Sequence, residues 1–119
     1  MIFEFRIFFM KDCLFCNFAT KKIKKDFVLE TETVMVFPDI KPVAEVHLLV
    51  APKRHIKEFS KLDLLRPAIF DVWTEIARTL QKLIKNYKLE RKGYRIVING
   101  GGAQAINHLH VHLMGGVSL

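Results

Sequence analysis

The sequence lacks the features that would divide it into parts or place it in a membrane. Its 119 residues contain no internal repeat, no low-complexity tract and no linker, which predicts a single domain over residues 1–119, large enough to enclose a core. No apolar run reaches the roughly 20 residues of a membrane-spanning helix, so we expect no membrane partner. Residues 1–12 lack a small-residue cleavage site, so we interpret them as an N-terminal extension of a cytoplasmic protein and not as a signal peptide.

Acidic residues are scarce relative to basic ones. Twelve Asp and Glu face nineteen Lys and Arg, which gives a net charge of +7. A basic surface attracts anionic ligands. Aromatic side chains do not alternate with the lysines as they would on a surface that stacks bases. We therefore interpret most of the lysines as solvated surface and do not expect nucleic acid as a partner.

Cysteine is rarer still, because the sequence contains only Cys13 and Cys16, which form one CxxC pair. This spacing suits half of a zinc site or a redox dithiol, and it also occurs by chance. The strand and helix of a βαβ unit that would frame a thioredoxin-like site are not evident around it. The motif alone leaves the three alternatives open.

Only five histidines are present, yet three of them alternate near the end of the chain, at His108, His110 and His112. The residues between and after them are Leu109, Val111 and Leu113. In a strand this period places the imidazoles on one face and the aliphatic side chains on the other. Such a row can bind phosphate, ligate a metal or attack an electrophile. A histidine-rich strand without chemistry is the alternative.

Hydrophobic periodicity and turn residues predict an α+β domain. We expect a short helix over 13–22, three strands, a long helix that ends before Gly93, and two further strands. The five strands, which short connections make mainly antiparallel, are expected at 27–29, 34–37, 46–51, 94–99 and 106–114.

The long helix is expected to carry a core-facing stripe. Ser60 or Asp63 can cap its start, and Pro67 fits within the first turn. The apolar positions at helical spacing are Leu65, Ile69, Val72 or Trp73, Ile76, Leu80, Leu83 and Ile84. Apolar residues outside a single stripe, together with the strand after Gly93, predict a two-fold dimer.

Five segments together resemble the histidine triad (HIT) superfamily, in its nucleotide-binding branch. They are Cys13–Phe18, Phe37–Ile40, His47–His55, Gly93–Asn99 and Gln104–Gly116. The resemblance implies a single HIT domain with the HIT-like fold, a homodimer and a purine nucleotide (AMP or GMP type) as partner. It also implies hydrolysis of nucleoside 5′-phosphoramidates or acyl-nucleotides through a nucleotidyl-histidine intermediate, with no metal needed for catalysis.

The resemblance assigns a role to each of four histidines. His110 matches the nucleophile that attacks the α-phosphorus, and His112 matches the histidine that contacts the phosphate or the leaving group. His108 matches a member of the triad that supports the site, and His47 one that hydrogen-bonds near the nucleophile. The chemistry is reasonable, because a neutral imidazole whose one N–H is held by a backbone carbonyl keeps a lone pair for attack.

Nucleotide-binding residues are assigned in the same way. Asp39 matches the carboxylate that accepts hydrogen bonds from the ribose, and Asn99 a polar residue on the phosphate side. Gln104, at the start of the last segment, is placed with them. The apolar base slot is matched by Leu14, Phe15, Phe18, Phe37 and Ile40. We also expect the glycine turn over 100–102 to offer backbone N–H groups to phosphate.

Members of the family with a CxxC pair complete a structural zinc site with two histidines. Here the resemblance implies Zn²⁺ on Cys13, Cys16, His55 and His108. Relatives often have Ser or Thr where this chain has Ala105, and a longer turn before the triad, which predicts slow turnover. The alternative function is therefore a zinc-containing nucleotide-binding or interaction module with little turnover.

Overall fold

The computed structural model describes residues 12–118. Their centre is a five-stranded antiparallel sheet with the strand order β1-β2-β3-β5-β4. The strands are β1 (Leu29–Glu30), β2 (Val34–Pro38), β3 (Val46–Pro52), β4 (Tyr94–Ile98) and β5 (Val111–Gly115). The predicted α+β class with an antiparallel five-stranded sheet is therefore confirmed. The interpretation of residues 1–12 as an extension concerns residues that lie, apart from residue 12, outside the described part of the chain.

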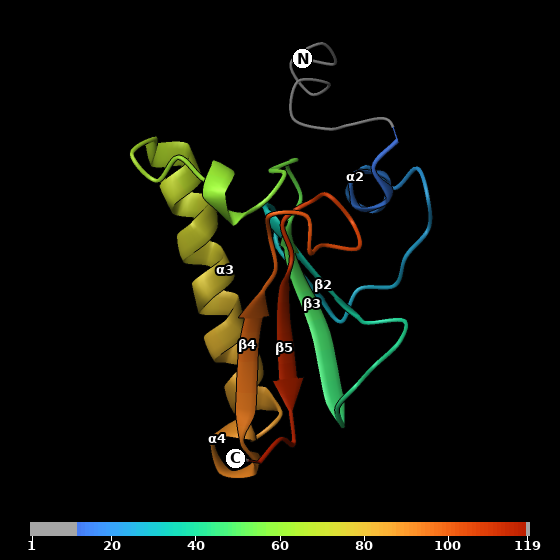
Figure 1. Ribbon diagram of the computed structural model, residues 1–119, viewed down its shortest axis with the longest axis vertical. Coiled ribbons are helices and arrows are strands. Elements are labelled where there is room, and N and C mark those ends of the chain that lie inside the picture. Colours follow the sequence, from blue (N-terminus) through green and yellow to red (C-terminus); the bar gives the residue numbers. More distant parts are fainter. Residues whose placement is uncertain (1–11, 119) are drawn as a thin grey trace.

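One long helix and one short helix cover the sheet, as predicted. The long helix α3 (Pro67–Asn86) runs along the sheet, and the short α2 (Leu14–Ala19) lies near β2 (Figure 1). The remaining helical segments are a single 3₁₀ turn, η1 (Phe59–Lys61), and the short α4 (Leu89–Lys92). Within residues 12–118, no helix has both the length and the apolar character needed to cross a membrane.

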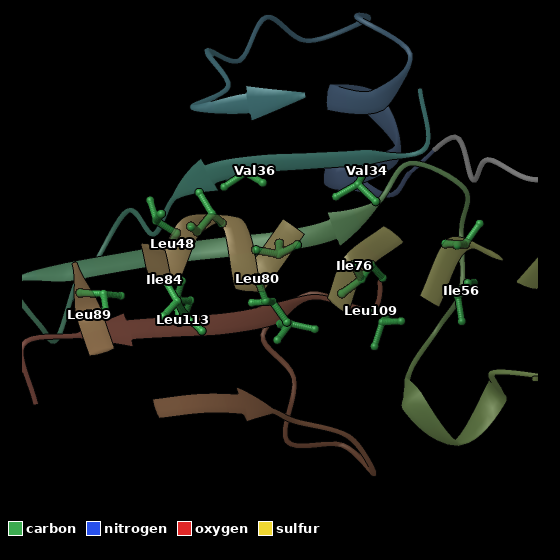
Figure 2. Close-up of a cluster of buried hydrophobic side chains, with 14 of the residues drawn as sticks. Val34, Val36, Leu48, Ile56, Ile76, Leu80, Ile84, Leu89, Leu109 and Leu113 are labelled. Atoms are coloured by element: carbon green, nitrogen blue, oxygen red, sulfur yellow. The ribbon is translucent and has the colours of Figure 1, made fainter. Parts of the chain in front are cut away.

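Strand β2 is apolar on both faces because α3 covers one side of it and α2 the other. Val34 and Val36 of β2 belong to a core cluster on the α3 side, whereas Met35 and Phe37 belong to a second cluster with residues of α2. The α3-side cluster also contains Leu48, Ile76, Leu80, Ile84, Leu109 and Leu113 (Figure 2). Burial on both faces explains why β2 reads as a continuous apolar run and not as an alternating one.

The start of α3 differs from the prediction in one respect. Pro67 occupies the first turn as expected, where its missing N–H costs no hydrogen bond. The N-cap, however, is Arg66, whose side chain makes no capping hydrogen bond, so the prediction of a cap at Ser60 or Asp63 was wrong. Ser60 lies in η1 instead. Leu65 precedes the helix and is 94% exposed, so it is not part of the core stripe.

The histidine strand is shorter than predicted, because β5 begins at Val111 and not at residue 106. Its pairing with both neighbours begins at Val111, which lies opposite Val50 of β3 and Ile98 of β4. Before it, the Leu109 N–H donates to the Ile56 carbonyl, 2.6 Å away, outside the sheet. The alternation of side chains nevertheless continues through residues 108–113.

Candidate functional site

A cavity of about 470 Å³ opens between α2, the end of β2 and the turn that follows β4. This size lies within the roughly 300–1,000 Å³ of small-molecule sites. Nine residues of the predicted site line it: Leu14, Phe15, Phe18, Phe37, Asp39, Ile40, Asn99, His110 and His112. Its other lining residues are Lys25, Pro38, Lys41, Leu49, Ala103, Ala105 and Ile106.

The cavity is walled on one side by aromatic rings. Phe15 of α2 packs edge-on against Phe37 of β2, with 5.1 Å between the ring centroids, and stacks on Phe18 at 5.8 Å. The same Phe15 ring meets the His110 ring edge-on at 5.2 Å. An apolar slot therefore leads directly to the imidazoles.

Hydrogen bonding fixes the tautomer of His110. Its Nδ1 lies 2.7 Å from the His108 carbonyl oxygen, which can only accept, so Nδ1 carries the proton and Nε2 keeps its lone pair. Burial lowers the pKa of His110 below its ordinary value, and the nearby His108 ring acts in the same direction. The carbonyl contact and the Asp39 charge oppose this shift, because both stabilise a protonated ring. The ring is therefore neutral near pH 7.

His47 lies behind the cavity wall and contacts His112, which lines the cavity. The Val43 N–H donates to Nδ1 of His47, so Nε2 of His47 carries the proton and donates to Nδ1 of His112 at 2.9 Å. This leaves the N–H of a neutral His112 on Nε2. Burial and the neighbouring His110 and His47 rings lower the pKa of His112. The Asp39 carboxylate lies 3.4 Å from His47 Nε2 and 3.8 Å from His112 Nδ1.

His108 is fully buried and does not line the cavity. Its Nε2–H donates to the Pro52 carbonyl at 2.8 Å, which leaves the lone pair of Nδ1 on the opposite side of the ring. That nitrogen lies 3.3 Å from Cys13 Sγ and 3.5 Å from Cys16 Sγ. The Nδ1 atom of His55 lies 3.3 Å from Cys16 Sγ.

These four side chains form a cluster whose ligand atoms all lie within 4.8 Å of one another. Hydrogen bonds from the side chain and the backbone N–H of Cys16 lower the pKa of Cys13 to about 3, although burial opposes them. Two sulfurs and two imidazole nitrogens are a tetrahedral zinc donor set, and the carbonyl that holds Nε2 of His108 is the kind of outer contact that orients a metal ligand. The residues present fit Zn²⁺.

A second group of possible ligands, Asp39 with His47 and His112, is less suited to a metal. The lone pair of His47 already accepts the Val43 N–H, and its Nε2–H points at His112. The hydrogen bonds within this group therefore occupy the atoms that would have to bind an ion.

Two expectations for the segment before the triad are not met by the geometry. The side chain of Gln104 does not line the cavity and donates to the His108 carbonyl at 3.4 Å. None of the glycines in the 100–102 turn lines the cavity either, and the Gly101 N–H donates to the Glu58 carboxylate at 3.3 Å. The turn contributes Asn99 before the glycines and the two alanines after them.

Sequence reasoning missed two lysines of the cavity, Lys25 and Lys41. Lys25 ends a run of basic residues that we interpreted as solvated surface, so composition concealed it. A signal was available for Lys41, because it follows Asp39 and Ile40 in the same proline-bounded loop.

Comparison with known proteins agrees with this geometry. Residues 20–119 match the HIT domain. An uncharacterized HIT-like protein of Chlamydia muridarum is 40% identical over 96 residues, which cover 79% of this chain and 73% of the relative. A HIT family hydrolase from Legionella pneumophila superposes with a TM-score of 0.79 at 35% identity, over 90% of this chain and 95% of that one. A histidine triad nucleotide-binding protein from Candida albicans gives a TM-score of 0.73 at 31% identity, over 86% and 73%.

Fold and site together define an α+β domain with three alternating histidines, of which two line a ligand-sized cavity and one belongs to a Cys/His cluster. The chain belongs to the HIT family.

Proposed function

We propose that this protein is a nucleotidyl hydrolase that binds a purine nucleotide and cleaves nucleoside 5′-phosphoramidates or acyl-nucleotides. The observation that carries the proposal is the lone pair of His110 Nε2, which faces a cavity whose other end is an apolar slot. Membership of a family that includes a hydrolase in Legionella pneumophila and a nucleotide-binding protein in Candida albicans supports it.

The cavity offers each part of a nucleotide suitable chemistry. The base would lie among the side chains of the base slot, which we define as Leu14, Phe15, Phe18, Phe37 and Ile40. The Asp39 carboxylate, at the edge of this slot, would accept hydrogen bonds from the ribose hydroxyls. The α-phosphate would then lie beside Asn99, His110 and His112, where the polar side chains gather.

The reaction follows from the protonation state of His110. Nε2 attacks the α-phosphorus and forms a P–N bond, while the bond from phosphorus to the leaving nitrogen or acyl oxygen breaks and the leaving group takes the electron pair. Water then attacks the same phosphorus, the P–N bond to His110 breaks, and the nucleoside monophosphate is released. The water proton passes to solvent or to a neighbouring imidazole, and His110 returns to its neutral form.

The contact with the His108 carbonyl gains importance after the first step. A nucleotidylated ring that retains its Nδ1 proton is positively charged, and the carbonyl oxygen 2.7 Å away stabilises that charge. In this proposal His108 is a positioning residue that acts through its backbone, and His47 positions His112 through the 2.9 Å hydrogen bond. The Nε2–H of His112 would donate to the phosphate or the leaving group.

Zinc has a structural role in the proposal. Zn²⁺ would be held by Cys13, Cys16, His55 and His108. The ion would thereby connect α2 to the segment that follows β3 and to the segment that precedes β5. Two unoxidised thiols are needed for this, and in the described chain neither cysteine forms a disulfide. A reducing compartment such as the cytoplasm, the location we propose, preserves them.

One observation favours the alternative of a nucleotide-binding module with little turnover. Ala105 lines the cavity and brings no hydroxyl group to it. The two functions differ only in rate, so a kinetic measurement separates them.

The test is a pair of measurements on wild type and His110→Ala. We expect wild type to hydrolyse adenosine or guanosine 5′-phosphoramidate, and His110→Ala to lose hydrolysis completely while it still binds the monophosphate. Mass spectrometry of wild type quenched during turnover should find a nucleotidyl adduct on His110. An adduct on another residue, or full activity in the variant, would disprove the mechanism.

A further inference from the structure

Lys25 differs from the other lysines of its basic run in its surroundings. Lys22 and Lys24 are exposed, whereas Lys25 is half-buried and lines the cavity. Its Nζ lies 5.5 Å from the ring centroid of Phe18 and 5.4 Å from that of Phe37, both of which belong to the base slot. The ammonium group is therefore held at the apolar end of the cavity.

No carboxylate within residues 12–118 forms an ion pair with this ammonium. Lys21 and Lys53, in contrast, both pair with Glu30. Lys25 instead keeps its three N–H donors available beside two aromatic rings.

Its outer side borders a second hollow, which is lined by Lys24, Lys25, Asp26, Pro38, Asp39 and Ile40. When no ligand is bound, the ammonium can therefore contact water. When a ligand fills the slot, the ammonium can donate to a hydrogen-bond acceptor of that ligand. A donor that lies partly out of water beside a ligand makes a stronger hydrogen bond than one on the open surface.

The other side chains of the slot cannot distinguish one purine from another by hydrogen bonding, because they are aliphatic or aromatic. Guanine presents two acceptors side by side, N7 and O6, whereas adenine presents the N7 acceptor beside an amino donor. A lysine ammonium donates and cannot accept. The Lys25 ammonium can therefore donate to both N7 and O6 of guanine. On adenine it meets one acceptor and the amino group, which is also a donor.

We propose that Lys25 is a specificity-determining residue that reads this edge of the base and makes the site prefer guanine nucleotides to adenine nucleotides. The inference rests on the proposed function, since it assumes that the apolar slot receives the base. It adds a substrate class to that function.

The experiment is calorimetric titration of wild type with GMP, IMP and AMP. IMP keeps N7 and O6 but lacks the amino group at position 2, so it isolates the edge that Lys25 would contact. We expect GMP and IMP to bind about tenfold more tightly than AMP, which corresponds to about 1.4 kcal/mol.

Three variants complete the design. Lys25→Met keeps an unbranched side chain of similar size and removes its donors, so it should bind the three nucleotides with equal affinity. Lys25→Arg retains donors and should retain the preference, which also shows that position 25 tolerates substitution. Lys22→Met, an exposed neighbour outside the cavity, is the matched control and should behave as wild type.

Each other outcome decides a different point. Equal affinity of wild type for AMP and GMP, or a preference that survives in Lys25→Met, would overturn the inference and leave the proposed function intact. An equal loss of GMP and AMP affinity in Lys25→Met would assign the ammonium to general attraction of the phosphate and would also overturn it. Failure of wild type to bind any of the three would refute the proposed function itself.

Discussion

At the scale of the residue, the chemistry of the cavity depends on which ring nitrogen of each histidine carries a proton. Backbone groups determine this for His110 and His47. The His108 carbonyl accepts a hydrogen bond from His110 Nδ1–H, and the Val43 N–H donates one to His47 Nδ1. The tautomer of His112, in contrast, depends on the side chain of His47, whose Nε2–H donates to His112 Nδ1. The reactive lone pair is thus determined by the path of the main chain.

The pH dependence of turnover follows from the lowered pKa values of His110 and His112. Protonation of His110 removes the lone pair of Nε2, so kcat/KM should fall as the pH decreases through the pKa of the pair. Because burial lowers both values, the midpoint should lie below 6.5, the ordinary value, and the rate should be on its plateau at pH 7. The measurement is a pH profile of kcat/KM on a phosphoramidate.

The Asp39→Asn variant provides a control for this interpretation. The Asp39 charge raises the pKa of both histidines, so its removal should move the midpoint further toward acid. A wild-type midpoint at or above 6.5, or a shift toward alkaline pH in the variant, would contradict the assignment.

Position 105 tests whether the site lacks assistance to the leaving group. Ala105→Ser introduces a hydroxyl into the cavity, and we expect kcat on a phosphoramidate with a poor leaving group to rise by up to about 100-fold, the low end of proton-transfer assistance. A substrate with a good leaving group should gain much less. Steady-state kinetics on both substrates measures the difference.

Ala103→Ser is the matched control, because Ala103 also lines the cavity and precedes the triad in the same turn. It should leave kcat unchanged. If Ala105→Ser gains nothing on the poor leaving group, position 105 lies too far from the reacting atoms, and the role assigned to it is wrong.

At the scale of the element, α2 depends on contacts at its N-terminus. The helix has six residues, and an isolated helix of that length is not stable in water. Cys13 caps it through a contact with the Cys16 N–H, and Phe15 and Phe18 bury its inner side. The Cys/His cluster therefore lies at the end of the helix that carries three of the five base-slot residues, where that helix needs support.

Removal of the metal should destabilise the protein measurably. If Zn²⁺ is present at 100 times its Kd, linkage predicts about 2.7 kcal/mol of stabilisation, which is about 10 °C in Tm for a chain of this size. We expect metal analysis to find one zinc per chain and a chelator to lower Tm by this amount. A Cys13→Ser/Cys16→Ser double variant should bind no zinc and should not respond to the chelator.

Most elements could be predicted from the sequence because their signals are local. Pro67 marked the first turn of α3, and Gly93, with a φ of +84°, ends the helical region as expected. The long helix itself already ends at Asn86, and the short α4 follows it. The start of β5 could not be predicted, because it depends on where β3 and β4 stop pairing, which is a property of the sheet. The exposed position of Leu65 has a similar origin, since only the fold decides where the helix begins.

The part of the candidate site that lies in recognisable sequence motifs could be predicted from the sequence. The alternating histidines, Asp39 and Asn99 stand in recognisable segments, and all but the buried His108 line the cavity. Lys25 was missed because nothing in a lysine run distinguishes the residue that lines the cavity. Gln104 was included because of its segment, but its side chain turns toward the backbone of His108.

At the scale of the whole molecule, the sheet has an edge that carries apolar side chains. In the described chain β4 is the last strand of the sheet and pairs only with β5. Tyr94 and Ile96 on this strand are each 44% exposed. Phe70, on the outer surface of α3, is exposed too, whereas Leu80 is buried in the core.

We propose that β4 pairs with its counterpart in a second copy of the chain, which would extend the sheet across a two-fold axis. Sedimentation equilibrium of wild type should give twice the 13.8 kDa of the chain. Ile96→Asp places a charge on the edge strand and should give the monomer mass. Val43→Asp, at a position that is also exposed but lies in the β2–β3 loop, is the control and should remain dimeric.

The alternation over residues 108–113 also limits how a chain of this kind can change in length during evolution. Loss or gain of a residue in the exposed turn after β4 alters only the reach of a loop. One residue removed between His108 and Leu113 would exchange the two sets of side chains, so that imidazoles would enter the apolar interior and leucines would face the cavity. Insertions and deletions should therefore collect in the turn and should be absent from the six residues that follow.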